Sequence, residues 1–284
     1  ILMTFTGHAA KKRFGQHWLK DQSVLKRIIE ASDLKPNDRI LEIGPGRGAL
    51  TKKLLTSSAS LVHAIELDRD LVISLRRQFK HYKNFSLESG DVLSIPLNLP
   101  DGKPANKVVA NIPYNITGKI LERLLGRLSL PAESIYEKLV LLMQKEVADR
   151  ILASPGQNCF SALSVRIQLL ATCSKVCLVP PKCFQPPPKV ESQVIVINPL
   201  HPKDRISQEI APLVEILIKT AFSSRRKMLR NTLSSFSSIS KLDFVANNVG
   251  ISLNQRPQEI SPSAWVMLAN GLGQIKENQP SQLL

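Results

Sequence analysis

The sequence lacks an apolar run long enough to cross a membrane, and its longest hydrophobic segments, such as KLVLLM at 138–143, have the length of a strand. Cysteine is also scarce: the four cysteines, Cys159, Cys173, Cys177 and Cys183, form no C-x-x-C pair and have no histidine close by in the sequence. This pattern disfavours a zinc site relative to isolated thiols in a reducing compartment. We therefore expect a soluble protein that holds no metal.

Acidic residues are the minority among the charged ones. The chain has 23 Asp and Glu against 38 Lys and Arg, a formal net charge of +15 and a pI near 9.9. This excess predicts an anionic partner, either nucleic acid or a membrane surface, and charge alone does not decide between them. The 284 residues, 43% of them hydrophobic, suffice for one large domain or one and a half with a sizeable core.

Short β-branched runs alternate with helical patterns from Arg39 onward. The expected strands are RILEI, LVHAIE, FSLESG, KVVAN and EKLVLLM, at 39–43, 61–66, 85–90, 107–111 and 137–143. Such alternation predicts an α/β fold with a parallel, doubly wound sheet. Two further strand-like segments flank a proline-rich loop within 174–197 and are expected to form an antiparallel edge pair.

Helical patterns replace strands from about Ile206. They cover 209–222, 224–233, 241–250 and 262–272, and predict a small helical domain. We place the boundary near Pro202, so that residues 1–202 form the α/β domain with a basic N-terminal arm and residues 203–284 form the helical domain.

Near the N-terminus, Asp21 is expected to cap a helix whose apolar positions include Val24, Leu25 and Ile28.

The stretch ILEIGPGRGALT at 40–51 follows an expected strand and opens a helix. Gly44, Gly46 and Gly48 allow the backbone to approach a ligand closely. Glu66 follows the loop at the sequence separation at which an acidic residue typically contacts ribose hydroxyls. Gly44, Gly46 and Ala49 also satisfy the G-x-G-x-x-A dinucleotide fingerprint, so the loop is only moderately specific. A simple tight turn is the alternative.

Two acidic positions favour S-adenosylmethionine over a nicotinamide. Glu42 precedes the glycine loop and would lie near the cofactor's cationic amino-acid end, and Asp91, followed by Val92 in SGDVL, could accept the adenine amine. For Asp91, a purely local role as a loop cap is an equally weighted reading.

The tetrad Asn111-Ile112-Pro113-Tyr114 ends the expected strand at 107–111. The Asn111 side-chain oxygen and the Ile112 carbonyl could accept hydrogen bonds from an exocyclic adenine amine, and Pro113 would fix the backbone so that this carbonyl points inward. Tyr114 would supply a stacking face for the base. A polar turn at the end of a strand is the alternative, but it does not explain the whole tetrad.

A basic cluster occurs in SSRRKMLRNTL at 223–233. Arg225, Arg226, Lys227 and Arg230 would fall within about two turns of the expected helix, a concentration that suits RNA phosphates. A solvated helix face is the alternative, and the large net charge favours RNA contact. The basic residues at 11–13 are a weaker candidate.

Together, FGQHWL, LEIGPGRGALT, Glu66, SGDVL, NIPYNITG, FQPPPKVES and FSSRRKMLRNTL resemble the KsgA/Dim-type ribosomal RNA adenine dimethyltransferases over most of the chain. The resemblance implies a Rossmann-like class I methyltransferase fold with a small helical RNA-binding domain. It also implies N6,N6-dimethylation of two adjacent adenines near the 3′ end of small-subunit rRNA, in an assembling ribosomal particle, by a monomer without a membrane partner.

Carried over residue by residue, the resemblance implies contacts to the methyl donor from Gln16, His17, Leu19, Gly44, Glu66, Asp91 and Asn111. It makes Tyr114 and Phe184 the expected partners of the target base. The chain departs from the family at His17 and Trp18, where asparagine and phenylalanine are common, so the donor contact of a side-chain amide is in doubt there.

The GQHWL variant is similar to cyanobacterial and plastid members, which favours a chloroplast over a bacterial cytoplasm or a mitochondrion. The sequence begins at Ile1 rather than methionine, which leaves room for a preceding leader. One rival function is a non-catalytic RNA- or DNA-binding protein that retained the fold. An NAD-dependent oxidoreductase would need a proton donor near the nicotinamide, and the sequence offers no convincing one.

Overall fold

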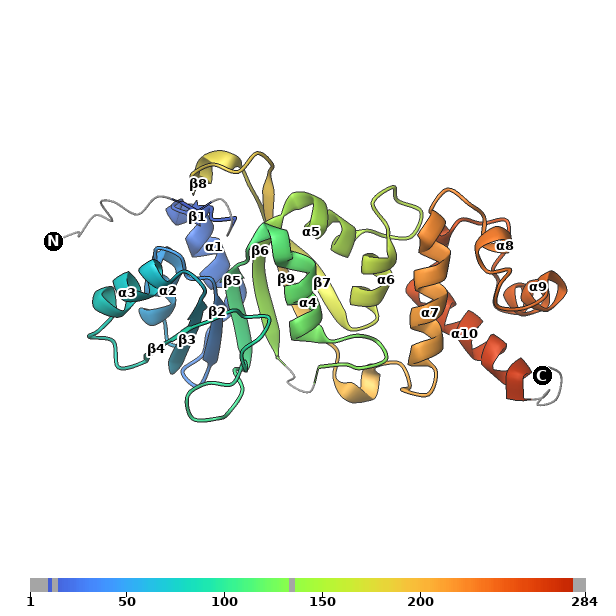
Figure 1. Cartoon of the computed structure of the whole chain (residues 1–284), viewed down its shortest axis with the longest axis horizontal. Coiled ribbons are helices and arrows are strands. Elements are labelled where there is room, and N and C mark those ends of the chain that lie inside the picture. The colour runs from blue at the N-terminus through green and yellow to red at the C-terminus, as the bar shows by residue number, and fades with distance from the viewer. Residues whose placement is uncertain (1–9, 12–14, 133–135, 278–284) are drawn as a thin grey trace. The chain divides into compact units, whose positions relative to one another are not determined.

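The computed structural model describes residues 10–11, 15–132 and 136–277, and this part of the chain divides into two compact units (Figure 1). Unit 1 comprises Ile1–Leu125, Ala132–Ala148 and Cys173–Pro199, and unit 2 comprises Gly126–Pro131, Asp149–Thr172 and Leu200–Leu284. Lys12 and Arg13 of the expected basic arm lie outside the described residues.

Unit 1 is organised around a seven-stranded sheet of order β4-β3-β2-β5-β6-β9-β7. The strands are β2 (Arg39–Ile43), β3 (Leu61–Glu66), β4 (Phe85–Ser89), β5 (Lys107–Asn111), β6 (Lys138–Gln144), β7 (Ala171–Val179) and β9 (Ser192–Pro199). Within the run β4-β3-β2-β5-β6, each strand pairs in parallel with its neighbours, whereas β9 runs antiparallel to β6. The five predicted parallel strands are thereby confirmed, and β9 and β7 lie at the edge expected for the segments around the proline-rich loop.

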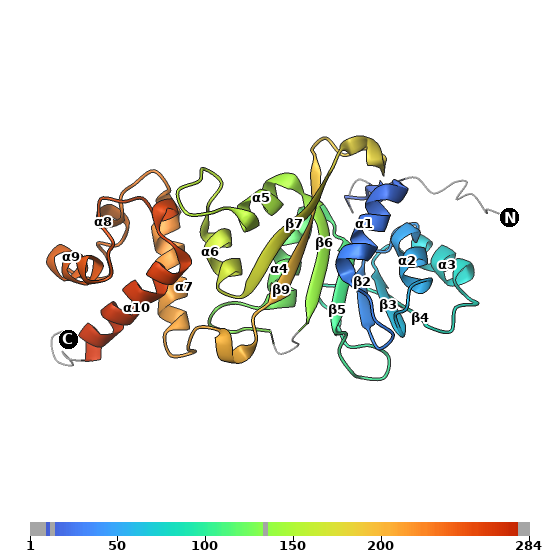
Figure 2. The ribbon, with the colours of Figure 1, turned by 180° about the vertical axis from the view of Figure 1, so that it is seen from behind.

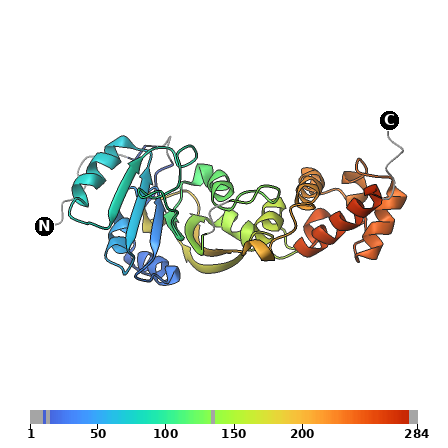
Figure 3. The same cartoon turned by 90° about the horizontal axis from the view of Figure 1, so that it is seen from below.

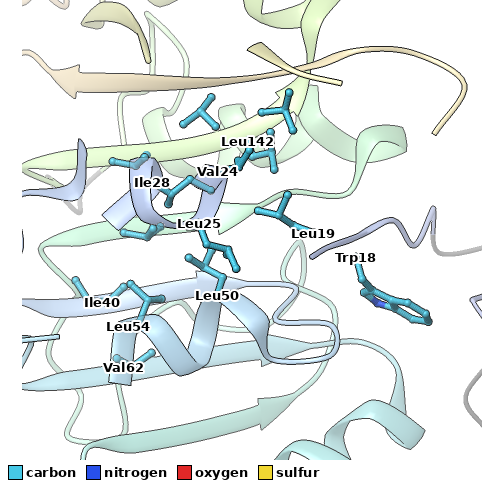
Figure 4. Close-up of a cluster of buried hydrophobic side chains, with 14 of the residues drawn as sticks. Trp18, Leu19, Val24, Leu25, Ile28, Ile40, Leu50, Leu54, Val62 and Leu142 are labelled. Atoms are coloured by element: carbon cyan, nitrogen blue, oxygen red, sulfur yellow. The ribbon is translucent and has the colours of Figure 1, made fainter. Parts of the chain in front are cut away.

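Helices cover both faces of this sheet. Helices α1 (Gln22–Ser32), α2 (Ala49–Leu55) and α3 (Arg69–Gln78) contribute to one buried cluster, and α4 (Thr117–Leu125) lies on the other side (Figures 2 and 3). In that cluster, Leu25 of α1 and Leu50 and Leu54 of α2 pack over the strands (Figure 4). The layered arrangement explains why the strands read as continuous apolar runs, because a parallel sheet is buried on both faces.

The N-terminal segment is fixed by two local features. Asp21 caps α1, as predicted, by accepting hydrogen bonds from the backbone N–H groups of Ser23 and Val24. Before it, β1 (Trp18–Leu19) pairs antiparallel with β8 (Phe184–Gln185) in a separate two-stranded sheet, with Leu19 opposite Phe184. This long-range pairing, which the sequence pattern did not predict, holds the segment before α1 against the proline-rich loop.

Unit 2 is helical. It contains α6 (Ala162–Gln168), α7 (Ala211–Ala221), α8 (Leu229–Thr232), α9 (Ile239–Asn248) and α10 (Pro262–Glu277), and α5 (Lys145–Leu152) ends in it. Trp265 is fully buried among these helices. The helices predicted at 209–222, 241–250 and 262–272 correspond to α7, α9 and α10.

The division differs from a single boundary near Pro202, because residues 149–172 pack with the helices rather than the sheet. Arg225 donates to the carbonyl oxygens of Asn158 and Phe160, at 2.6 and 3.1 Å, and the Ser129 hydroxyl donates to Glu215. Two insertions into the α/β part of the sequence thus belong structurally to the helical unit.

The helix predicted over 224–233 is wrong as a continuous element. A 3-10 turn at Phe222–Ser224 is followed by irregular backbone, and α8 begins only at Leu229 after the extended Met228. The reason is tertiary: the backbone N–H groups of Leu229 and Arg230 donate to Gln255 and Leu253, at 2.9 and 3.0 Å, and Leu229 is fully buried.

Candidate active site

A cavity in unit 1 lies where the parallel strands end. It is lined by residues of the N-terminal segment, the glycine loop and the segments that follow β3, β4 and β5, among them Gln16, His17, Gly44, Gly46, Glu66, Asp91, Val92, Asn111, Ile112, Pro113 and Tyr114. The carboxyl ends of parallel strands meet at one edge of a sheet, and ligands of open α/β sheets bind outside that edge. Most of the residues singled out in the sequence therefore come together.

The glycine loop between β2 and α2 is shaped by its own backbone hydrogen bonds. Gly44 and Gly46 have φ of +66° and +59°, a conformation that side chains other than glycine rarely adopt. The N–H of Gly44 donates to the Ile65 carbonyl at 2.9 Å, and that of Gly46 donates to the Glu66 carboxylate at 3.1 Å. The loop is thereby tied to the end of β3, beside the cavity.

Trp18 covers this loop. A Cβ on Gly46 would lie 2.5 Å from the Trp18 ring, and the Arg47 guanidinium lies over the same ring, 4.0 Å from its centroid. Gly48 has a different role: it precedes α2, does not line the cavity, and is excluded from carrying a side chain because a Cβ would lie 2.7 Å from Phe79. Its predicted contact with a cofactor is therefore replaced by a packing role.

Glu66 and Glu42 differ in their exposure to the cavity. Glu66 lines it, and its two oxygens accept from Gly46 and from the backbone N–H of Asp68. Burial raises the pKa of Glu66, while these two hydrogen bonds oppose the shift. Glu42 is 1% exposed and lies off the lining, contrary to the prediction, and burial raises its pKa to about 8. It is therefore mostly neutral at pH 7 and is no counter-charge for a cation.

Asp91 has both of the roles considered for it. One carboxylate oxygen accepts from the backbone N–H of Leu93 at 2.9 Å, which makes it a loop cap, and the residue also lines the cavity together with the buried Val92. The second oxygen has no hydrogen-bond partner among the described residues. A ligand donor could therefore bind there without breaking the cap.

Asn111 presents an unsatisfied acceptor. Its side-chain nitrogen donates to the His17 carbonyl at 2.9 Å, whereas its Oδ1 is buried and has no partner in the described part of the chain. The next residue is anchored, since the Ile112 N–H donates to the Leu142 carbonyl at 3.1 Å, and Pro113 has an extended backbone. An orphaned buried oxygen costs free energy unless a donor arrives, so this position fits a ligand N–H.

Tyr114 is held at both ends of its side chain. Its hydroxyl hydrogen-bonds to that of Ser192, which is fully buried at the start of β9, and burial raises the pKa of Tyr114 to about 12. The His17 ring stacks on it, with 5.7 Å between centroids and 25° between planes. The phenol is therefore a fixed, neutral aromatic platform.

Gln16 lines the cavity but is already engaged. Its Oε1 accepts from the backbone N–H of Lys11 at 2.7 Å, and its Nε2 donates to Asp68 at 2.9 Å. The Lys11 ammonium binds both Asp68 and Asp70. These contacts tie Lys11 and Gln16 to the start of α3, so Gln16 shapes the cavity wall.

Leu19 and Phe184 do not line the cavity. They face each other across the β1–β8 ladder, with 5% and 1% exposure, inside the hydrophobic cluster. The expected sandwich of a base between Tyr114 and Phe184 is therefore absent from this structure, because the Phe184 ring is packed in the core. Its position supports β1, which carries Trp18.

Two kinds of side chain occur among the four basic residues at 225–230 that are predicted to contact RNA. The Arg225 guanidinium binds the backbone carbonyls of residues 158 and 160 and so has a structural role. Arg226, Lys227 and Arg230 are exposed, and the described residues offer them no partner. Of the four, these three side chains are available to a polyanion.

Several site residues escaped the sequence reasoning. Trp18 packs on Gly46 and Ser192 hydrogen-bonds to Tyr114, and both contacts join residues distant in sequence, so no local signal marks them. Gly90 and Asn115 line the cavity and lie within the quoted motifs SGDVL and NIPYNITG. In the described ranges, no group of three or more His, Cys, Asp or Glu side chains could hold a metal ion, and no helix has the length and apolarity of a membrane span.

Comparison with known proteins identifies a family for the chain. The model of the family described as "Ribosomal RNA adenine dimethylase" matches residues 7–273. "Ribosomal RNA small subunit methyltransferase A" of Prochlorococcus marinus (strain MIT 9303) is 62% identical over 95% of this chain and 96% of the relative. The protein of the same name from Synechococcus sp. (strain CC9311) is 60% identical over 96% of this chain and 99% of the relative.

Solved structures show the same fold. A dimethyladenosine transferase from Plasmodium falciparum superposes with a TM-score of 0.70 at 26% identity, over 90% of this chain and 98% of that chain. The 23S rRNA methyltransferase ErmE superposes with a TM-score of 0.71 at 24% identity, over 90% and 99%. The expected class I methyltransferase fold is thus confirmed, and the chain belongs to the ribosomal RNA adenine dimethylase family.

Proposed function

We propose that the protein transfers methyl groups from S-adenosylmethionine to the N6 amines of two adjacent adenines near the 3′ end of small-subunit rRNA. Membership of the adenine dimethylase family and the high identity with proteins named small subunit methyltransferase A support this substrate. The single observation that carries it is the buried, unpartnered Oδ1 of Asn111 at the cavity wall.

The chemical problem is that the adenine amine is a poor nucleophile, because its lone pair is delocalised into the ring. Hydrogen bonds from the amine to Asn111 Oδ1 and to the Ile112 carbonyl would direct its lone pair away from the ring. The donor's sulfonium makes its methyl carbon electrophilic, which is all the chemistry the cofactor needs to supply. The amine proton becomes acidic once nitrogen is alkylated, so positioning, rather than a strong base, lowers most of the barrier.

Tyr114 supplies the stacking face in this scheme. Extruding the target base from its stack costs a few kcal/mol, and stacking on an aromatic side chain returns about 1–3 kcal/mol per base. Because Ser192 fixes the phenol and burial keeps it protonated, Tyr114 binds without taking part in proton transfer. We assign Phe184 to the support of β1 and not to base contact.

The residues around the cavity fit the donor. Glu66 and Asp91 follow adjacent strands and offer carboxylate oxygens for ribose hydroxyls and for an adenine amine, while Val92 adds an apolar surface. Gly44 leaves room for close backbone approach, whereas the space beside Gly46 is taken by the Trp18 ring. His17 lines the same wall, and its carbonyl fixes the orientation of Asn111.

For the partner, we propose rRNA within an assembling small-subunit particle, bound by a monomer with help from Arg226, Lys227 and Arg230 of the helical unit 2. The relatives are cyanobacterial, which supports a bacterial-type enzyme, and we propose the plastid as its location. Light scattering would test the monomer, and imaging of a full-length tagged protein would test the location.

The decisive experiment is mass spectrometry of small-subunit rRNA from cells with and without the protein. We expect N6,N6-dimethyladenosine at two neighbouring positions only when the protein is present. Unchanged methylation would instead favour the non-catalytic RNA-binding alternative. Purified protein incubated with labelled donor and either free rRNA or undermethylated particles would then identify the preferred substrate.

A further inference from the structure

The His17 ring stacks on Tyr114, the residue to which we assign the target base. His17 and Tyr114 line the same cavity, and their rings stack with 5.7 Å between centroids and 25° between planes, which is the range of offset aromatic stacking. One face of the Tyr114 ring is therefore covered by the imidazole. Tyr114 itself is fixed through its hydroxyl bond to Ser192.

The His17 ring is held far less firmly than its backbone. Apart from the stack, Nδ1–H donates to the Pro186 carbonyl at 2.9 Å, and the ring's other nitrogen has no partner among the described residues. The backbone, in contrast, accepts from Asn111 and continues into β1, which pairs with β8. Rotation of the side chain can therefore uncover Tyr114 without moving the carbonyl that orients Asn111.

We infer that His17 occupies the place of the target adenine in the free protein and is displaced when the base enters, so that it sets the affinity for RNA at the methylation site. The inference rests on the proposed function. An imidazole and a purine would be alternative partners of one tyrosine face, and the imidazole keeps that face covered until RNA arrives. His17 is then a residue that determines substrate affinity, beyond any contact that it makes to the donor.

Competition between His17 and the base predicts the opposite change in RNA affinity from a role in which His17 only supports Tyr114. A ligand whose site is open only part of the time binds more weakly in proportion to the open fraction. One aromatic stack and one hydrogen bond favour the state in which the ring covers Tyr114 over the uncovered state by about 3- to 30-fold. Removing the ring should strengthen RNA binding by a comparable factor, whereas a ring that merely held Tyr114 in position would weaken RNA binding when removed.

The test uses His17→Ala with a synthetic rRNA hairpin in which 2-aminopurine replaces one target adenine. We expect its dissociation constant, read from the fluorescence increase on unstacking, to fall about 3- to 30-fold. His17→Phe, which keeps a ring on Tyr114, should stay within about 3-fold of the wild type. His81→Ala removes an exposed imidazole outside the cavity and is the matched control.

Weaker or unchanged hairpin binding by His17→Ala, with an unchanged melting temperature, would overturn the inference. If that variant melts early, His17→Phe and His17→Gln decide the question: Gln, which cannot stack, should bind more tightly than Phe, and the reverse order would overturn it. Methylation of the unmodified hairpin by the wild type separates the two proposals. Its absence counts against the proposed function, whereas its presence with the wrong order of affinities counts against the His17 inference alone.

Discussion

Replacing Asn111 by alanine removes the side-chain nitrogen and the side-chain oxygen, which have different functions. The side-chain nitrogen holds the His17 carbonyl at 2.9 Å, and the oxygen is the unpartnered acceptor assigned to the adenine amine. Loss of the first bond costs about 1 kcal/mol of folding stability, which a protein with this core tolerates. Loss of one preorganised hydrogen-bonding group at a reacting centre typically lowers the rate about 10²–10³-fold, or about 2.7–4 kcal/mol.

The assay for Asn111→Ala is single-turnover transfer of labelled methyl groups to rRNA, with RNA affinity measured separately by anisotropy. We expect the rate to fall about 10²–10³-fold and the affinity to stay nearly the same, because the exposed basic residues are untouched. Asn84→Ala, which removes an amide that bonds to the Ala59 carbonyl away from the cavity, controls for a general loss of an asparagine. Undiminished transfer by Asn111→Ala would refute the assigned role.

Three further changes test other parts of the account. Phe184→Ala should lower the free energy of unfolding by about 3–5 kcal/mol, measured with denaturant, because the ring is 1% exposed; full stability with weakened RNA binding would restore its base-stacking role. Arg226→Glu should reduce the slope of log affinity against log salt by about 1, and an identical slope would argue against phosphate contact. Burial raises the pKa of Glu42 from 4.5 to about 8, so the folded protein retains a proton that the unfolded chain has released. The free energy of unfolding therefore falls as pH rises through that window, by at most about 1.4 kcal/mol per pH unit, and Glu42→Gln should flatten the dependence. Parallel wild-type and mutant curves would contradict the assigned protonation.

The parts of the site that follow strands were predictable because they depend on local pattern. The run before Gly44 and the run before Asn111 each read as a buried parallel strand, and such strands end at one edge of the sheet. Glu66 and Asp91 follow from the same rule, since β3 is the neighbour of β2 and β4 is the neighbour of β3 in the sheet. Position along a strand was enough to bring these residues to one cavity.

The errors share a physical cause, which is packing between segments far apart in the sequence. Phe184 is buried because β8 pairs with β1, and Arg225 is engaged because its guanidinium binds the carbonyls near residue 160. Glu42 belongs to a predicted strand, but the pattern does not say that its side chain points away from the cavity. The interrupted helix at Met228 likewise reflects hydrogen bonds to residues 253 and 255.

The central claim is tested most directly by a crystal structure of the protein with S-adenosylhomocysteine and the unmethylated rRNA hairpin. The account predicts an extruded adenine stacked on Tyr114, with its N6 within hydrogen-bond distance, about 2.7–3.2 Å, of Asn111 Oδ1 and directed at the donor's sulfur. An adenine amine bound elsewhere, with Asn111 Oδ1 still unpartnered, would contradict it.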